Sequence, residues 1–155
     1  MNAVLGKATV SFLALLCFAT VAAASGTVKL SVDLRSAPQH IIHSTMRIPV
    51  VPGLMTLRYP KWLPGEHGPT GPIKDVAGIF VKANGKDIGW TRDPKDMFAF
   101  DVMVPAGATE IEASLDLLIP TNTEGFSSGA SATAKLAVLS WNQVVLYPAG
   151  VKGNA

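Results

Sequence analysis

Apolar and polar residues alternate along several stretches of the chain, and a period of two is typical of half-buried β-strands. Residues 27–35 place Val28, Leu30, Val32 and Leu34 on one face. The pattern returns in three longer stretches, with expected inward sets Ile42, Met46, Ile48 and Val50 in residues 41–50; Phe98, Phe100, Val102 and Val104 in residues 97–104; and Ile111, Ala113, Leu115 and Leu117 in residues 110–119. A shorter strand is expected over residues 54–59.

Turn-forming residues separate these strands. Ala83-Asn84-Gly85 lies between short apolar runs at 76–82 and 86–90, and Asn-Gly favours a type I′ hairpin because both positions tolerate positive φ. About eight short strands, with turns between them and no amphipathic helical pattern, predict an all-β fold. We expect an antiparallel β-sandwich or an open barrel.

Two further segments follow the predicted strand 110–119. Thr121 to Thr133 is rich in Thr, Ser, Gly and Ala, which predicts a loop by composition. Leu136 to Tyr147 is a last apolar run that contains Trp141 and ends at Pro148. No internal repeat is found in the sequence.

The first residues have the composition of a secretory signal peptide. Lys7 supplies a positive charge, residues 8–21 are mostly apolar, and Ala22-Ala23-Ala24 offers a small-residue cleavage site before Ser25. The apolar run is short for a membrane span, although an uncleaved anchor is the alternative. We expect residues 1–24 to be removed, residues 25–155 to form one β-domain, and the protein to be secreted or periplasmic.

Charge and cysteine content narrow the expected partners. The whole chain has 13 basic and 11 acidic residues, with a formal net charge of +2 that includes Lys7. This near-neutral balance predicts neither nucleic acid nor an anionic membrane as a partner once the signal is cleaved. The single cysteine lies within the predicted signal peptide, so the mature chain is expected to form no disulfide.

The least regular stretch is Tyr59 to Ile73, with four prolines and three glycines in fifteen residues. Proline removes a backbone donor and glycine permits sharp turns, so neither a helix nor a central strand is expected here. We predict an ordered loop in which Trp62 is a buried aromatic anchor and Glu66 and His67 project. A purely structural alternative is that Trp62 caps one end of the β-core.

The sequence Tyr-Pro-Lys-Trp-Leu-Pro-Gly-Glu-His-Gly-Pro-Thr-Gly-Pro-Ile of residues 59–73 resembles the signature segment of the N-terminal domain of the glycyl aminopeptidase family of zinc metallopeptidases. Further matching segments follow in order and extend the resemblance over nearly the whole mature chain: Gly85-Lys86, Trp90-Thr91-Arg92-Asp93, Met97-Phe98-Ala99-Phe100, Val104-Pro105, and residues 141–150, which read Trp-Asn-Gln-Val-Val-Leu-Tyr-Pro-Ala-Gly.

The resemblance implies a thermolysin-like catalytic domain after this one, often followed by a PDZ-like domain, with the zinc ligands and catalytic glutamate in the catalytic domain. Such an enzyme needs His-Glu-x-x-His on one helix, and this chain contains no such motif. We therefore expect no catalytic residue, no metal ligand and no cofactor in this chain, and no activity of the chain alone.

The remaining chemically interesting residues support only modest expectations. His40 and His43 are three apart, a spacing that points side chains to opposite faces of a strand, so solvated positions are expected rather than a metal site. Arg92-Asp93 before Pro94 is interpreted as a local ion pair or as an Asp turn. Ser127-Ser128-Gly129 lacks the context of a nucleophile elbow and is interpreted as loop.

Two functional hypotheses remain. In the first, the chain is the non-catalytic N-terminal β-domain of a secreted zinc aminopeptidase-like enzyme, incomplete at its C-terminal end, and it packs against its own catalytic domain and helps to shape the active site. In the second, it is a free-standing secreted β-sandwich that binds a peptide or glycan through the Trp62 loop. In both, Trp62, Glu66 and His67 are the candidate contact residues.

Overall fold

The computed structural model describes residues 26–121 and 129–150. The predicted signal peptide, residues 1–24, lies outside this part of the chain, as do Ser127 and Ser128. Strands and loops make up the described part, with three short 3₁₀ helices: η1 (Ala37–Gln39), η2 (Ile73–Asp75) and η3 (Trp141–Gln143). Among the described residues, no helix is long and apolar enough to cross a membrane.

The larger sheet has five strands in the order β1-β2-β8-β4-β5. These strands are β1 (Lys29–Asp33), β2 (Ile41–Pro49), β8 (Glu110–Leu118), β4 (Val76–Ala83) and β5 (Lys86–Ile88). All neighbours are antiparallel, and the longest pairing joins β2 to β8 from Ile41↔Leu118 to Pro49↔Glu110. The strand order places β8 at the centre.

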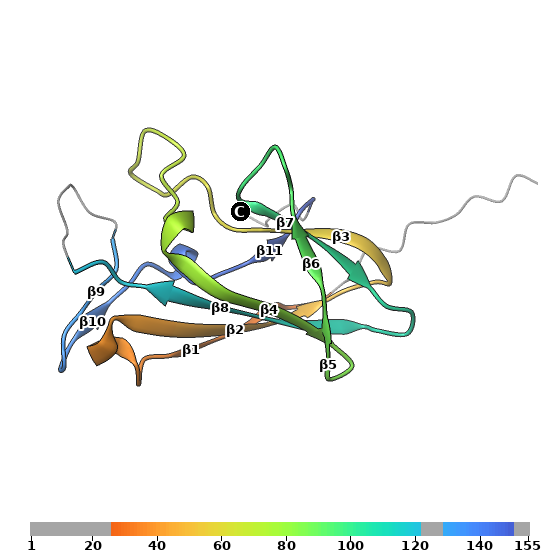
Figure 1. Ribbon diagram of the computed structural model, residues 1–155, viewed down its shortest axis with the longest axis horizontal. Helices are drawn as coiled ribbons and strands as arrows, with labels where there is room; N and C mark the ends of the chain where they lie inside the picture. Colours follow the sequence, from red (N-terminus) through yellow and green to blue (C-terminus); the bar gives the residue numbers. More distant parts are fainter. Residues whose placement is uncertain (1–25, 122–128, 151–155) are drawn as a thin grey trace, which may run out of the picture.

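A second sheet has four strands in the order β11-β3-β7-β6. They are β11 (Tyr147–Pro148), β3 (Gly53–Arg58), β7 (Ala99–Val104) and β6 (Trp90–Arg92), again antiparallel. A small ribbon of β9 (Ser131–Ala132) and β10 (Ala137–Val138) completes the fold. In Figure 1 the five-stranded sheet forms the lower layer and the four-stranded sheet the upper layer.

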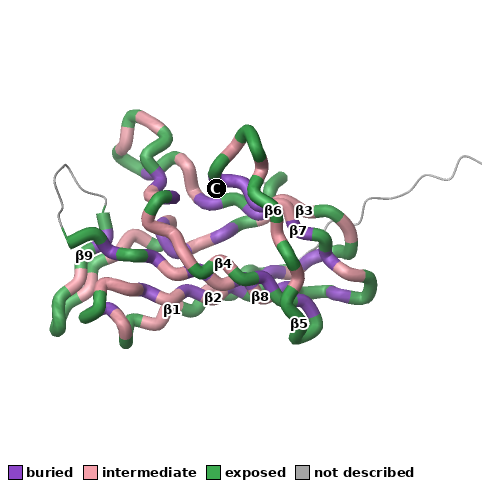
Figure 2. Tube along the Cα trace, viewed as in Figure 1, coloured by how far each residue is buried: buried purple, intermediate pink, exposed green. Residues whose placement is uncertain are grey.

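The core lies between the two sheets, where Figure 2 shows many of the buried residues. Met46, Ile111 and Leu115 of the lower sheet pack in one cluster with Leu57 and Phe100 of the upper sheet, and all five are fully buried. The inward sets expected for 41–50, 97–104 and 110–119 are all buried, so these three predictions are confirmed. The two layers confirm the all-β fold and identify it as a sandwich.

The predicted hairpin is also confirmed. Ala83 pairs with Lys86, which leaves Asn84 (φ 52°) and Gly85 (φ 74°) as the two-residue turn. Positive φ at both positions is the geometry of a type I′ turn, which suits the twist of the flanking strands.

The two ends of the described chain differ from the sequence expectation. The strand predicted over 27–35 is shorter: the edge strand β1 covers only Lys29–Asp33, so Val28 and Leu34 lie beyond its ends and are exposed. The final apolar run forms η3 and the two-residue β11, and its Trp141 is 67% exposed.

Candidate functional site

The Pro/Gly loop of residues 59–73 is held by its apolar ends. Tyr59 is fully buried, and its hydroxyl donates a hydrogen bond to the carbonyl oxygen of Gln143 at 2.8 Å. Burial of the phenol raises the pKa of Tyr59, and the nearby Asp75 carboxylate adds to this shift. Leu63 and Ile73 are also buried. The loop is therefore anchored at its two ends and near its middle.

Trp62 is not one of these anchors. Its side chain is 63% exposed, so the prediction of a buried tryptophan is wrong. The backbone bends at Trp62, and the next residue, Leu63, is the one whose side chain is buried. Sequence reasoning assigned the aromatic anchor to the wrong ring, since Tyr59 fills that role.

Backbone contacts keep the loop compact. The Gly71 N–H donates to the Lys61 carbonyl oxygen at 3.0 Å, and the Glu66 N–H donates to the Leu63 carbonyl oxygen at 3.1 Å. A Cβ on Gly71 would lie 2.0 Å from the Pro60 carbonyl oxygen, so only glycine fits at this crossing. The turn at Gly65 has φ +86°, which also favours glycine.

Glu66 and His67 occupy the outer part of the same loop. His67 is exposed, as predicted, whereas Glu66 is half-buried and takes part in an interaction of its own. The structure thus brings Trp62, Glu66 and His67 together on one ordered loop. Its prolines and backbone hydrogen bonds restrict the loop, so an exposed tryptophan here is presented in a defined position.

A second loop, residues 93–98, is tied to the first. The Lys61 ammonium lies 3.2 Å from a carboxylate oxygen of Asp96, and it also lies over the Phe98 ring. Desolvation acts to raise the pKa of Asp96, but the hydrogen bond from the Phe98 N–H and the Lys61 ammonium outweigh it, and the pKa is lowered.

The Arg92-Asp93 pair shapes this second loop. Asp93 accepts hydrogen bonds from the N–H groups of Lys95 and Asp96, which confirms its interpretation as an Asp turn. The Arg92 guanidinium lies 4.7 Å from the centre of the Phe100 ring and donates to the Met97 carbonyl oxygen. Met97, two residues before β7, is itself 55% exposed.

The sequence did not reveal a chain of polar contacts around His43. His43 Nδ1 lies 2.6 Å from Asp116 Oδ1, and His43 Nε2 lies 3.1 Å from Ser36 Oγ. Asp33, His43 and Asp116 are cross-strand neighbours on β1, β2 and β8. The expectation of a merely solvated His43 is therefore wrong, because strand register aligned it with Asp116, which is 73 positions away in the sequence.

Serine, histidine and aspartate in this connectivity resemble a hydrolytic triad, which also needs an oxyanion hole. The N–H groups of Arg35, Ala37 and Gln39 are already bonded to Asp33 Oδ1, Leu34 O and Ser36 O, and residue 38 is proline. At most the N–H of Ser36 itself is left among its neighbours to stabilise an oxyanion. The contacts instead fasten η1 to the five-stranded sheet.

These histidines do not fit a catalytic zinc ion. Both ring nitrogens of His43 have protein partners, and His40 lies at a left-handed position (φ 62°) with its Nδ1 buried and unbonded. Within residues 26–121 and 129–150, no three His, Cys, Asp or Glu side chains are grouped to hold a metal ion.

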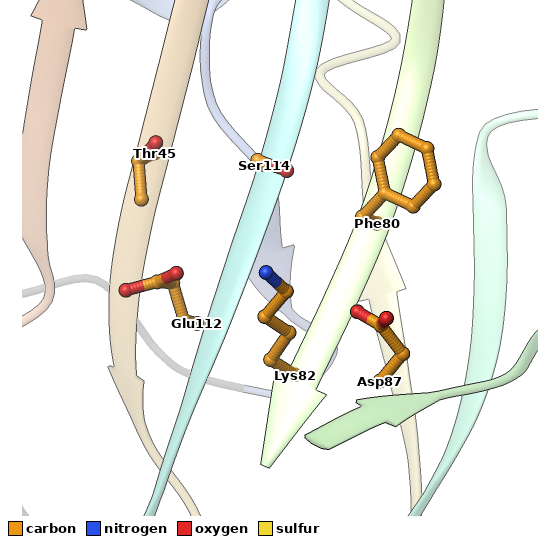
Figure 3. A pocket seen from close by; sticks show the side chains of 6 residues that line it. All are labelled: Thr45, Phe80, Lys82, Asp87, Glu112 and Ser114. Atoms are coloured by element: carbon orange, nitrogen blue, oxygen red, sulfur yellow. The ribbon is translucent and has the colours of Figure 1, made fainter. Parts of the chain in front are cut away.

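The outer face of the five-stranded sheet carries a shallow hollow of about 340 Å³. Figure 3 shows its six lining residues, Thr45, Phe80, Lys82, Asp87, Glu112 and Ser114, on neighbouring strands. Lys82 is the cross-strand neighbour of both Glu112 and Asp87. Charges that alternate across an open face favour solvation over the enclosure of a small ligand.

Comparisons with known proteins agree with the β-sandwich fold. The family model described as Peptidase M61 N-terminal domain matches residues 29–155. A similar solved structure is the crystal structure of an aminopeptidase N family protein from Idiomarina loihiensis, with a TM-score of 0.67 and 12% identity over 80% of this chain and 20% of that chain. At this identity the likeness shows the fold alone, and this chain spans about a fifth of that protein. The search of curated protein sequences gave no match.

Proposed function

Because the chain belongs to the family of the peptidase M61 N-terminal domain, we propose that it is the non-catalytic β-domain of a secreted or periplasmic zinc aminopeptidase-like enzyme. The sequence resemblance to the N-terminal domain of a peptidase family is thereby confirmed, whereas export, zinc and the role of the loop belong to this proposal. In it, residues 1–24 are a cleaved signal peptide and residues 25–155 are the domain.

The domain is proposed to pack against the catalytic domain of the same polypeptide and to help shape its active site. One observation carries the proposal: Trp62 is 63% exposed on a loop that is ordered by buried anchors and backbone hydrogen bonds. Holding a large apolar ring in water has no benefit for this domain alone, whereas a rigid exposed aromatic is typical of a contact surface. Glu66 and His67 follow it on the same loop.

In this proposal, zinc would be held by the catalytic domain of the full polypeptide, where it would polarise a peptide carbonyl and activate water. This chain's part is positional. Tyr59, Leu63 and Ile73 are buried and fix the loop, while Trp62 and His67 are exposed for contact with the neighbouring domain or with the peptide that it binds.

The test uses a long polypeptide in which this chain precedes the peptidase M61 catalytic domain. The coding sequence after Ala155 is first read for an in-frame His-Glu-x-x-His. We expect the long polypeptide to bind zinc and to hydrolyse aminoacyl-p-nitroanilides, and the 155-residue chain to do neither. Peptidase activity of the short chain, or an inactive long polypeptide with its zinc motif intact, would overturn the proposal.

The loop is tested in the same long polypeptide. Trp62→Ala, and Glu66→Ala combined with His67→Ala, are expected to lower kcat/KM at least tenfold without lowering the melting temperature. Lys86→Ala is the control, because Lys86 is exposed on β5 of the five-stranded sheet, away from this loop. Unchanged kinetics in both loop variants would remove the loop from the proposal.

The exposed Trp62 also favours the second hypothesis, a free-standing sandwich that binds a peptide or glycan. Exposed aromatic rings serve both kinds of ligand. Titration of the purified chain with a casein digest or with chitohexaose, followed by tryptophan fluorescence, distinguishes the two. A saturable change that Trp62→Ala abolishes would support this hypothesis, and its absence with both probes would count against it.

A further inference from the structure

We propose that the outward face of the four-stranded sheet, centred on Leu54, Met103 and Tyr147, is the surface on which the catalytic domain docks. We call this surface the upper face. The inference rests on the proposed function and adds to it the location of the contact, which lies on the sheet itself and extends beyond the Trp62 loop.

The upper face has large apolar side chains at outward-facing strand positions, where a sheet face exposed to water usually carries polar or charged residues. Leu54 and Met103 are direct cross-strand partners on β3 and β7, and they are 71% and 62% exposed. Tyr147 of β11, 42% exposed, pairs with Arg58. Adjacent large apolar residues such as Leu54 and Met103 mark contact surfaces more often than single exposed residues do, and Tyr147 adds an aromatic ring at the far end of the same face.

The polar groups of the upper face, those of Thr56, Arg58, Thr91 and Asp101, are partly satisfied within the domain. Thr56 donates a hydrogen bond to Asp101 Oδ1 at 2.6 Å across the same strand pair. Thr91 pairs with Asp101 on the other side of β7. Covering the sheet part of this face therefore buries the Asp101 carboxylate, which already has a partner, and the Arg58 guanidinium at the rim. Because these are the two charged groups involved, the desolvation cost is limited.

The two loops described above extend the upper face. In Figure 1, loop 60–72 and loop 93–98 both rise above the four-stranded sheet, on the side away from the five-stranded sheet. The Lys61–Asp96 ion pair links them, and the residues next to that pair, Trp62 and Met97, are 63% and 55% exposed. Five exposed large side chains thus lie on the sheet and on the loops beside it.

The path of the chain favours the following domain as the occupant. After Pro148 the Ala149 N–H still donates to the Thr56 carbonyl oxygen, at 2.8 Å, so the described chain continues along the free edge of β3 toward Leu54. A domain that follows is therefore tethered at the edge of the upper face. The similar aminopeptidase N family structure is about five times as long as the matched part, which leaves ample protein to cover it.

Hydroxyl-radical footprinting with mass spectrometry tests the proposal, because methionine and tyrosine are readily oxidised. The 155-residue chain is compared with the long polypeptide. Labelling of Met103 and Tyr147 is expected to fall at least fivefold in the long polypeptide, while labelling of Phe80, 60% exposed on the opposite sheet, changes less than twofold. Equal labelling of Met103 in the two proteins would overturn the inference.

A paired variant adds a functional control. Leu54→Lys with Met103→Glu keeps an attractive cross-strand pair, so the sheet is expected to fold, but it makes the face charged. In the long polypeptide this variant is expected to restore Tyr147 labelling to the level of the short chain. Thr45→Lys with Ser114→Glu places the same pair on the other sheet, where Thr45 and Ser114 are partners, and is expected to leave Tyr147 protected.

The outcomes separate this inference from the proposed function. An active long polypeptide with Met103 fully labelled keeps the proposed function and rejects the upper face. An inactive long polypeptide rejects the proposed function, and its Met103 labelling still decides whether the face is covered. Protection of Met103 in the short chain that disappears on dilution, together with a dimer in sedimentation, would assign the face to a second copy and overturn the inference.

Discussion

The two sheets of the sandwich have similar inner faces and different outer faces. On the outside of the five-stranded sheet, a row of cross-strand neighbours runs through all five strands: Lys29, Arg47, Glu112, Lys82 and Asp87. Arg47 lies 3.6 Å from Glu110 and 3.4 Å from Glu112. Such exposed pairs add little stability, but they keep most of this face solvated, with Phe80 as its exposed aromatic residue.

On the outer face of the four-stranded sheet, the outward-facing cross-strand neighbours Leu54 and Met103 are apolar. Both faces are presented by strands with the same inward alternation, so this difference does not arise from the requirements of the core. Exposed apolar pairs do not stabilise the domain by themselves, and larger apolar patches often mark contact surfaces. Under the docking proposal above, the contrast separates a face left in water from a face that contacts the catalytic domain.

The largest expected effect tests the similarity of the inner faces. Phe100→Ala in the upper sheet and Leu115→Ala in the lower sheet each remove a fully buried side chain from the shared cluster. We expect losses of about 3–5 and about 2–5 kcal/mol in the free energy of unfolding, respectively. Urea titration followed by circular dichroism measures both. A loss below about 1 kcal/mol in only one variant would show that the layers are not equally packed.

The next effect concerns the buried phenol that fastens the upper sheet's loop. Tyr59→Phe removes the hydroxyl that donates to the Gln143 carbonyl oxygen and leaves that buried acceptor without this donor. The expected cost is about 1–3 kcal/mol. Tyr147→Phe is the matched control on the exposed face, with an expected change within about 0.5 kcal/mol. Equal costs for the two variants would contradict the assignment of Tyr59 as the anchor.

The lower sheet has its own special position, a bulge in β4 between Ala77 and Phe80. Gly78 there has φ +57°, and a Cβ would lie 2.6 Å from Asp116 Oδ2, the carboxylate that contacts His43. Gly78→Ala is expected to cost about 1–2 kcal/mol from the left-handed backbone. Gly89→Ala, where nothing lies near the added Cβ, serves as control in thermal unfolding. A neutral Gly78→Ala would mean that the bulge adjusts.

A small effect is expected for Trp62→Ala in the isolated chain. Because the ring is largely exposed, the change in the free energy of unfolding should stay within about 0.5 kcal/mol. Differential scanning calorimetry gives the value. A drop in melting temperature comparable to that of Phe100→Ala would restore the tryptophan as a core anchor and remove its role as a contact residue.

The smallest effect is electrostatic and belongs to the lower sheet. Hydrogen bonds from the Arg35 side chain, then its backbone N–H, lower the pKa of Asp33 from 3.8 to about 2. Because the folded pKa is the lower one, this stabilisation is present above about pH 4 and is lost as pH falls toward 2. The melting temperature of Asp33→Asn should therefore fall slightly less between pH 4 and pH 2 than that of the unchanged chain. An unchanged slope would show that the pair contributes nothing in solution.

Local sequence patterns determined a large part of this protein. Alternation identified the inward sets of β2, β7 and β8, because a buried face repeats every second residue wherever a strand lies on a core. Asn84-Gly85 determined its hairpin, since few other residues accept its backbone angles. Proline and glycine content identified the ordered loop 59–73, and the match of that loop indicated the peptidase family.

Only the tertiary structure decided which faces and rings are buried. Trp62 and Tyr59 are both aromatic and only three positions apart, and the strand end beneath them determined that Tyr59 enters the core. Register across separate strands brought His43 to Asp116 and Leu54 to Met103, 73 and 49 positions apart in the chain. Sequence periodicity specifies which residues share one strand's face, whereas the packing of both sheets decides whether that face contacts core, water or another domain.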